Sequence, residues 1–383
     1  MADIGTWLAL KSVPGVGNLV YKQLIAKFKT PEKVFAATEA ALVEVEGIST
    51  RLARTLRTHR PGAGIRAEIR RAEELGCRII SFNDPDYPSL LRHIPDPPPY
   101  LYVRGRFPLF ENGIAVVGAR KASGYGMAAA RRLAGELAAM GWTIVSGLAR
   151  GIDTAAHKGA LEGGGRTVAV MGSGFAEIYP PENRDLFERI CDQGAVISEF
   201  SVNEPPNAYN FPSRNRIISG MTLGTVVVEA SSRSGSLITA RLAAEQGREV
   251  FAVPGSIHSH TSQGTHSLLK QGAKLVTSVE DINEEFTRFQ VQASSSIPEA
   301  SIIKSGPSDG NPVPCGAVGS PDLSPDLMTV LKMIEHYPAH IDDLCRKSGM
   351  AAGRLSGLLL NLELKGLIVQ RPGKYFCLKE EPH

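Results

Sequence analysis

Residues 114–145 read IAVVGARKASGYGMAAARRLAGELAAMGWTIV, and this stretch contains the pattern that decides the fold. An apolar run at 114–117 is followed by a Gly-containing turn, a helical stretch and a second apolar run at 143–145. Two short apolar runs joined by a helix are typical of parallel β-strands with a crossover helix between them. The stretch therefore predicts one unit of a parallel α/β sheet.

The same alternation continues along the chain. Further strands are expected at residues 77–82, 100–103, 168–171, 196–197, 226–228, 250–253 and 275–276. From residue 114 onward, helical stretches of about ten to fifteen residues separate the strands. The predicted fold class is therefore α/β, an extended Rossmann-like, doubly wound parallel sheet.

The first 60 residues differ from the rest, because they carry nine Lys and Arg against five Asp and Glu and have helical hydrophobic spacing. Two turns, Pro14-Gly15-Val16-Gly17 and Glu46-Gly47-Ile48-Ser49, each precede an amphipathic segment. A doubled helix-hairpin-helix and a plain small helical bundle both fit this pattern. In a helix-hairpin-helix, the free backbone N–H groups at the start of the second helix can bind a DNA phosphate without contacting the bases.

The end of the chain predicts a flexible linker and a winged helix. Residues 289–322 are rich in Ser, Pro and Gly, and helices are then expected at 327–335, 341–347 and 351–365, followed by a hairpin at 367–370 and 374–378. From residue 323 onward, eight basic residues face seven acidic ones, which favours protein contact over DNA binding. The expected domains are thus residues 1–70 (helical, helix-hairpin-helix or SAM-like), 71–288 (Rossmann-like core), 289–322 (linker) and 323–383 (winged helix).

Composition limits the class of protein. The chain has 383 residues, 43% of them hydrophobic, and a formal net charge of +3, which gives no overall signal for nucleic acid. Its apolar runs are far shorter than the ~18 residues that span a bilayer, so a cytoplasmic protein without membrane contact is expected. Five scattered cysteines without a Cys-x-x-Cys pair suggest neither a disulfide framework nor a zinc knuckle.

Most of the loops expected after the strands contain Gly or Ser together with Arg or Lys. They are Gly118-Ala119-Arg120-Lys121, Ser146-Gly147-Leu148-Ala149-Arg150-Gly151, Gly172-Ser173-Gly174, Pro181-Glu182-Asn183-Arg184, Pro212-Ser213-Arg214-Asn215-Arg216 and Ser232-Arg233-Ser234-Gly235-Ser236. Since the carboxyl ends of parallel strands meet at one edge of a sheet, these loops predict a rim that binds phosphates, and several together suit a polyanion. Alternatively, the glycines are there only for steric reasons.

The sequence contains few residues that indicate nucleotide binding or catalysis. The chain has no Gly-x-x-x-x-Gly-Lys-Ser/Thr run, and Arg120 stands where a strict dinucleotide motif needs a small residue. Asp153 and His157 share a helix face near Ser146, which also fits an ordinary helix-start interaction. His258, His260 and His266 have no nearby carboxylate or thiol to complete a metal site. No catalytic residue, metal or cofactor is therefore expected.

The core loops closely resemble those of the bacterial DNA-processing protein A (DprA, or Smf) family over about residues 80–286. The resemblance is carried by residues 146–153 (SGLARGID) with His157, Tyr179-Pro180 with Asn183, Ser198-Glu199, residues 211–220 (FPSRNRIISG), Val228-Glu229-Ala230 with residues 234–240 (SGSLITA), and Val253-Pro254-Gly255. Tyr87-Pro88, Leu90, Leu91, Ile94, Asp96 and Pro97 match the family as well.

The resemblance implies a dimeric, non-enzymatic protein that binds single-stranded DNA and hands it to RecA recombinase during natural transformation and DNA recombination. Carried over, the DNA-binding residues are Gly118, Arg120, Ser146, Gly147, Arg214, Asn215 and Arg216, with Arg184 and Phe211 as weaker additions. Lys121, in the same loop as Arg120, is expected to bind DNA with them. Phe211 either stacks on a base or packs beneath its loop. Replacing Arg120 or Arg214 by Ala is expected to weaken DNA binding and leave folding intact.

Two other functions remain as alternatives. One is an enzyme of the nucleotide phosphoribohydrolase type that uses the same crevice, although the loop at 234–240 lacks the carboxylate that such chemistry needs. The other is a transcription regulator that reads duplex DNA with its winged helix.

Overall fold

The computed structural model describes residues 3–60, 62–107 and 112–286, together with scattered positions between 330 and 378. The chain divides into two compact units, Met1–Pro298 and Glu299–His383. The linker expected at 289–322 lies outside the described residues. Each unit is described by itself.

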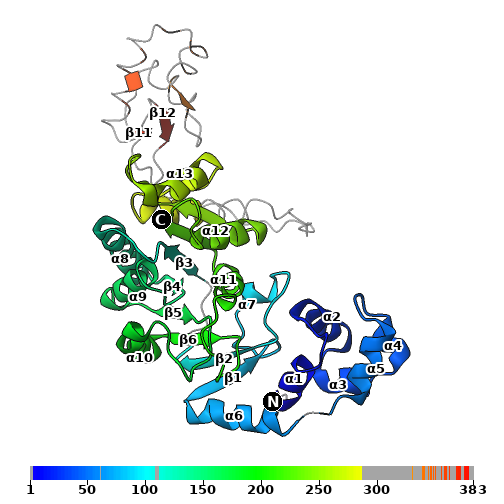
Figure 1. The fold of residues 1–383 in the computed structure, drawn as a ribbon. Coiled ribbons are helices and arrows are strands. Elements are labelled where there is room, and N and C mark those ends of the chain that lie inside the picture. The colour runs from blue at the N-terminus through cyan, green and yellow to red at the C-terminus, as the bar shows by residue number, and fades with distance from the viewer. Residues whose placement is uncertain are drawn as a thin grey trace, which may run out of the picture. The chain divides into compact units, whose positions relative to one another are not determined.

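A nine-stranded sheet forms the centre of the first unit (Figure 1). Its order is β1-β2-β6-β5-β4-β3-β7-β8-β9, in which all neighbours from β6 to β9 are parallel, while β2 is antiparallel to both β1 and β6. The strands are β1 (Cys77–Ser81), β2 (Tyr100–Gly105), β3 (Gly113–Gly118), β4 (Thr143–Ser146), β5 (Thr167–Val170), β6 (Ala195–Ser198), β7 (Gly224–Val228), β8 (Glu249–Ala252) and β9 (Lys274–Leu275). The predicted doubly wound α/β fold is confirmed, and every core strand expected from the sequence is present.

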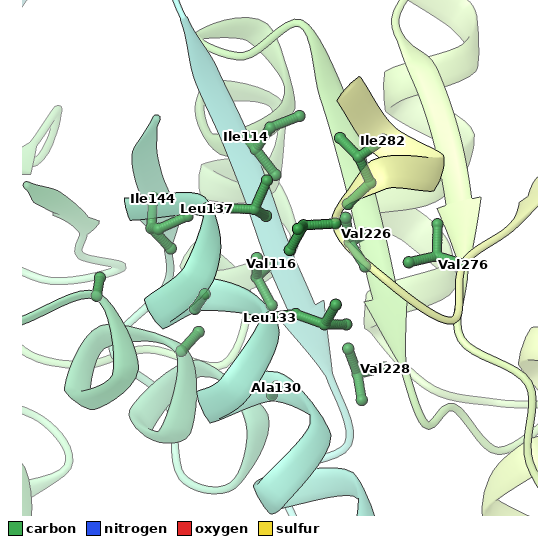
Figure 2. Packing of buried hydrophobic residues seen from close by; sticks show 14 of the residues in the cluster. Ile114, Val116, Ala130, Leu133, Leu137, Ile144, Val226, Val228, Val276 and Ile282 are labelled. Carbon is green, nitrogen blue, oxygen red and sulfur yellow. The ribbon is translucent and has the colours of Figure 1, made fainter. Parts of the chain in front are cut away.

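Helices cover both faces of this sheet, because the central strands carry apolar, buried residues on both faces. Ile114 and Val116 of β3 pack against Leu133 and Leu137 of helix α8, as Figure 2 shows. The intervening residues of β3 belong to a second apolar cluster, shared with the helices of the opposite face. The helices are α7 (Ser89–Arg92), α8 (Gly124–Ala139), α9 (Ile152–Glu162), α10 (Arg184–Gln193), α11 (Asn210–Gly220), α12 (Ser236–Glu245) and α13 (Gln263–Lys270), with two 3₁₀ turns, η1 (Pro181–Asn183) and η2 (His260–Ser262).

Helices α8 and α9 lie unusually close together. A Cβ atom added to Gly159 of α9 would stand 2.1 Å from the Arg131 carbonyl oxygen of α8. Only glycine allows this approach, since a methyl group at that distance overlaps the neighbouring backbone. The two helices follow β3 and β4, so both begin at the edge of the sheet where these strands end.

Six helices precede the sheet: α1 (Ile4–Lys11), α2 (Asn18–Phe28), α3 (Pro31–Ala36), α4 (Glu39–Val43), α5 (Thr50–Thr58) and α6 (Ala63–Glu74). The two predicted turns join α1 to α2 and α4 to α5, and their glycines have positive φ, 93° at Gly15 and 79° at Gly47. The Cβ position of Gly15 lies 3.2 Å from Leu52, and that of Gly47 lies 3.7 Å from Val20. Each turn thus contacts the helix that follows the other turn, so the two hairpins form a reciprocal pair.

The second unit contains a small antiparallel sheet of order β10-β12-β11, formed by β10 (Ala339–His340), β11 (Ile368–Arg371) and β12 (Tyr375–Leu378). The predicted hairpin is confirmed as β11 and β12, whereas β10 was not expected. The three helices expected at 327–335, 341–347 and 351–365 lie largely outside the described residues. In the part of the chain that the structure describes, no helix is long and apolar enough to cross a membrane.

Candidate nucleic-acid interface

A cleft of about 770 Å³ opens where the strand order reverses, between β3 and β7. Its walls come from the loop after β3, the loop after β7, the first turns of α11 and the 3₁₀ turn η2. This is the position at which open α/β sheets bind their ligands, because two neighbouring crossovers leave the sheet in opposite directions there. The cleft is therefore the candidate site.

Arg120, Phe211 and Tyr179 form a cation–aromatic group at one end of the cleft. The Arg120 guanidinium lies 5.2 Å from the centre of the Phe211 ring. The centres of the Tyr179 and Phe211 rings lie 5.7 Å apart. A Cβ atom on Gly172 would stand 2.7 Å from the Phe211 ring, so this glycine makes room for the ring. Phe211 is half-buried and lines the cleft, so its ring is not wholly packed beneath its loop, and stacking on a base stays a prediction. The group offers a cation and aromatic surface side by side.

Arg214 is a buried cation at the floor of the cleft, with only 3% of its surface exposed. Its Nη1 donates a hydrogen bond to the Val170 carbonyl oxygen at 2.7 Å, whereas its Nε has no partner. A Cβ atom on Gly147 would lie 1.8 Å from Nη1, so the guanidinium packs directly beneath that glycine. Burial lowers the pKa of Arg214 to about 10, and the nearby Asp153 carboxylate opposes this shift, so Arg214 stays charged at neutral pH.

Asp153, at the start of α9, holds the loop after β4. Its Oδ2 accepts hydrogen bonds from the backbone N–H groups of Gly147 at 3.2 Å and Ala149 at 3.3 Å. Burial raises the pKa of Asp153, and the Arg214 charge acts against that shift. Asp153 therefore shapes the loop beneath which Arg214 packs.

Ser146 and His157 do not complete a nucleophilic arrangement with Asp153. The Ser146 hydroxyl donates to the Val116 carbonyl oxygen at 2.7 Å. His157 Nδ1 lies 2.7 Å from the Thr167 hydroxyl, and burial lowers the pKa of His157 to about 3. Both side chains lie in the interior, where they join neighbouring strands and helices.

One expected loop is wrong. Residues 212–216 lie inside α11, because Pro212 occupies the first turn, where a helix tolerates proline. The helical turn separates the two arginines. Arg214 lines the cleft, whereas Arg216 is buried between Glu199, whose carboxylate its Nη1 and Nη2 contact at 2.6 Å each, and Asp96 at 2.8 Å. These carboxylates outweigh the burial of Arg216 and raise its pKa.

The structure brings together six of the ten expected site residues around the cleft: Gly118, Arg120, Lys121, Phe211, Arg214 and Asn215. Gly147 lines an adjoining hollow of about 160 Å³ that also includes Arg120 and Phe211. The other three expected residues line neither the cleft nor this adjoining hollow. Ser146 is buried, Arg184 is exposed at the start of α10, and Arg216 is ion-paired. Gly118 also has a steric reason to be glycine, because its Cβ would stand 1.9 Å from the Val228 oxygen.

Several lining residues were not selected from the sequence. Tyr179 belongs to a motif that the sequence shows, but only its position in space reveals that it lines the cleft, whereas Ser234 comes from one of the loops expected at the rim. His260 and Thr261 come from η2, whose sequence has no charge pattern that points to a ligand. Among the described residues, no group of three His, Cys, Asp or Glu side chains is placed to hold a metal ion.

Two family models match the chain. The model described as DNA recombination-mediator protein A matches residues 78–287, which include the whole cleft. The model described as DprA winged helix domain matches residues 317–374.

Relatives and solved structures agree with these matches. Protein Smf of Escherichia coli is 37% identical over 385 residues, which cover 100% of this chain and 98% of that protein. Protein Smf of Synechocystis sp. is 36% identical over 96% of each chain. The crystal structure of DNA processing protein A from Streptococcus pneumoniae superposes with a TM-score of 0.65 at 34% identity, over 74% of this chain and 99% of that chain. A structure of DNA processing protein A from Helicobacter pylori, described for its single-stranded DNA binding mode, has a TM-score of 0.50 at 27% identity, over 56% of this chain and 98% of that chain.

Proposed function

Because the chain belongs to the DprA/Smf family of DNA-processing proteins, we propose that its cleft binds single-stranded DNA. The protein acts in the cytoplasm as a non-enzymatic homodimer that protects incoming DNA and loads RecA onto it during natural transformation and recombination. The full-length similarity to the Smf proteins and the single-stranded DNA named for the Helicobacter pylori relative support this proposal.

The observation that carries the proposal is the cation–aromatic group of Arg120, Phe211 and Tyr179. A single strand presents a phosphate and an unpaired base in each nucleotide, and this group places a guanidinium beside two aromatic rings. Lys121 adds a second exposed cation on the same loop. The contacts to phosphate make affinity depend on salt, and stacking makes it tolerant of sequence.

The other domains have supporting roles in this proposal. We assign residues 1–70 to a helical domain, 71–288 to the DNA-binding core, 289–322 to a linker and 323–383 to a winged helix that contacts protein. The near balance of eight basic and seven acidic residues after position 323 supports the last assignment.

A competition experiment tests the proposal. A labelled single-stranded oligonucleotide is bound to the full chain and displaced by unlabelled strand, duplex or mononucleotide. We expect the unlabelled strand to displace the label at far lower concentration than the other two. A mononucleotide that competes as well as the strand would favour an enzyme of the nucleotide type, and preference for one duplex sequence would favour a regulator. RecA assembly on the same strand, measured with and without the protein, tests the loading step.

A further inference from the structure

A second hollow, of about 440 Å³, lies next to the cleft. It is lined by Ser123 and Tyr125 at the start of α8, by Glu229 after β7, and by residues from the segment 254–262. The segments 118–123, 229–231 and 259–262 each contribute residues to both the hollow and the cleft. The hollow and the cleft therefore share the walls that these three segments form.

Glu229 makes the hollow unsuitable for a phosphate. Its side chain is buried, Oε2 accepts the Ser123 backbone N–H at 2.8 Å, and Oε1 accepts the Ser123 hydroxyl. The carboxylate thus already occupies the position of an anion at the start of α8, and it repels a second one. Each carboxylate oxygen can accept a further hydrogen bond, so the hollow offers acceptors to an amino group.

Tyr125 provides a flat apolar surface at the same place. Its hydroxyl donates to the Pro254 carbonyl oxygen at 3.2 Å, which fixes the ring against the hollow. The residue is nevertheless 59% exposed. An exposed aromatic ring beside hydrogen-bond acceptors matches the face and the amino edge of a nucleobase.

We propose that this hollow holds a nucleobase of the strand bound in the cleft, stacked on Tyr125 with its amino edge toward Glu229. The inference rests on the function proposed for the cleft and extends the DNA path beyond it. A carboxylate accepts a hydrogen bond from the N4 amino group of cytosine, and thymine has no such group. The hollow therefore prefers cytosine to thymine.

The test measures affinity of the full chain for oligo(dC) and oligo(dT) of graded length. The variants are Tyr125→Ala, Tyr125→Phe and, as the control, Met127→Ala, an exposed residue of the same helix that lines neither the cleft nor the hollow. We expect Tyr125→Ala to weaken binding about fivefold for long strands and to leave the shortest binding strand unaffected. Tyr125→Phe and Met127→Ala should keep wild-type affinity within about twofold, and the dC preference should disappear in Tyr125→Ala.

The outcomes separate this inference from the function on which it rests. If Tyr125→Ala follows the wild type at every length while Arg120→Ala weakens binding at every length, the hollow binds no base and the cleft still binds DNA. Equal wild-type affinity for oligo(dC) and oligo(dT) at every length overturns the contact with Glu229. If Arg120→Ala changes binding at no length, the proposed function itself fails.

Discussion

Arg120 and Arg214 carry the same charge, but they occupy different environments at the same cleft. Arg120 is exposed and rests on the Phe211 ring, where its guanidinium is free to meet a phosphate. Arg214 is buried, bonded to the Val170 oxygen and close to the charge of Asp153. The burial of Arg214 revises the expectation that both can be removed without loss of stability.

Replacing each arginine by Ala should separate these roles. Arg120→Ala should weaken single-stranded DNA binding about tenfold and leave the free energy of unfolding unchanged. Arg214→Ala should lower the free energy of unfolding by about 2 to 4 kcal/mol, because a buried hydrogen-bonded cation is lost beside a buried carboxylate. Binding titrations and urea unfolding measure the two effects, with Arg189→Ala, an exposed residue of α10, as the control. Equal stability of both variants would contradict the buried role of Arg214.

Because His157 is buried and its pKa is lowered, we expect the free energy of unfolding to decrease in mild acid. Its pKa falls from 6.5 to about 3 on folding, so between these values the unfolded chain binds the extra proton and stability decreases as pH falls. From about pH 7 to about pH 5 this contributes a loss of about 2 kcal/mol. Urea unfolding at several pH values should show a smaller dependence on pH in His157→Gln than in the wild type. Parallel curves for the two proteins would show that His157 is not the titrating group.

At the scale of elements, glycine controls how closely α8 and α9 pack. Gly159→Ala should lower the free energy of unfolding by about 1 to 3 kcal/mol, because its Cβ meets the Arg131 backbone oxygen at 2.1 Å. Gly124→Ala, in α8, is the matched control, since its Cβ would have nothing within 4 Å. Thermal unfolding of the two variants is the measurement. A Gly159→Ala variant as stable as Gly124→Ala would disprove the close helix contact.

The strands were predictable because a parallel sheet buries both faces, so that runs such as residues 226–228 are apolar throughout. The segment 212–216 was predicted as a loop because its Pro, Ser and Asn are typical of turns, yet Pro212 fits the first turn of a helix. Of the cations expected on the rim, Arg120, Lys121 and Arg214 line the cleft, and the sequence did not show which of the expected cations would be taken up by ion pairs elsewhere. The ion pairs of Arg216 join it to Asp96 and Glu199, and pairs between residues so far apart in the sequence leave no local signal.

At the scale of the whole molecule, the net charge of +3 on 383 residues describes an average and not the binding surface. The exposed Arg120 and Lys121 and the buried Arg214 line the cleft, and the acidic side chain of Glu229 lines the neighbouring hollow. In the proposed binding mode, the cations of the cleft contact phosphates of the strand, and the carboxylate in the neighbouring hollow contacts a base of the same strand. The reciprocal hairpins of the first 60 residues, which carry nine basic and five acidic side chains, are a second place where DNA contact remains a prediction.

The most direct test of phosphate binding in the cleft is a titration of the full chain with single-stranded and duplex DNA over a series of salt concentrations, for the wild type and Arg120→Ala. We expect the logarithm of the affinity for single strands to fall linearly with the logarithm of the salt concentration and to exceed that for duplex throughout. Arg120→Ala should make this slope shallower by about one. An affinity for single strands that does not depend on salt, or an unchanged slope in Arg120→Ala, would contradict a phosphate-binding cleft.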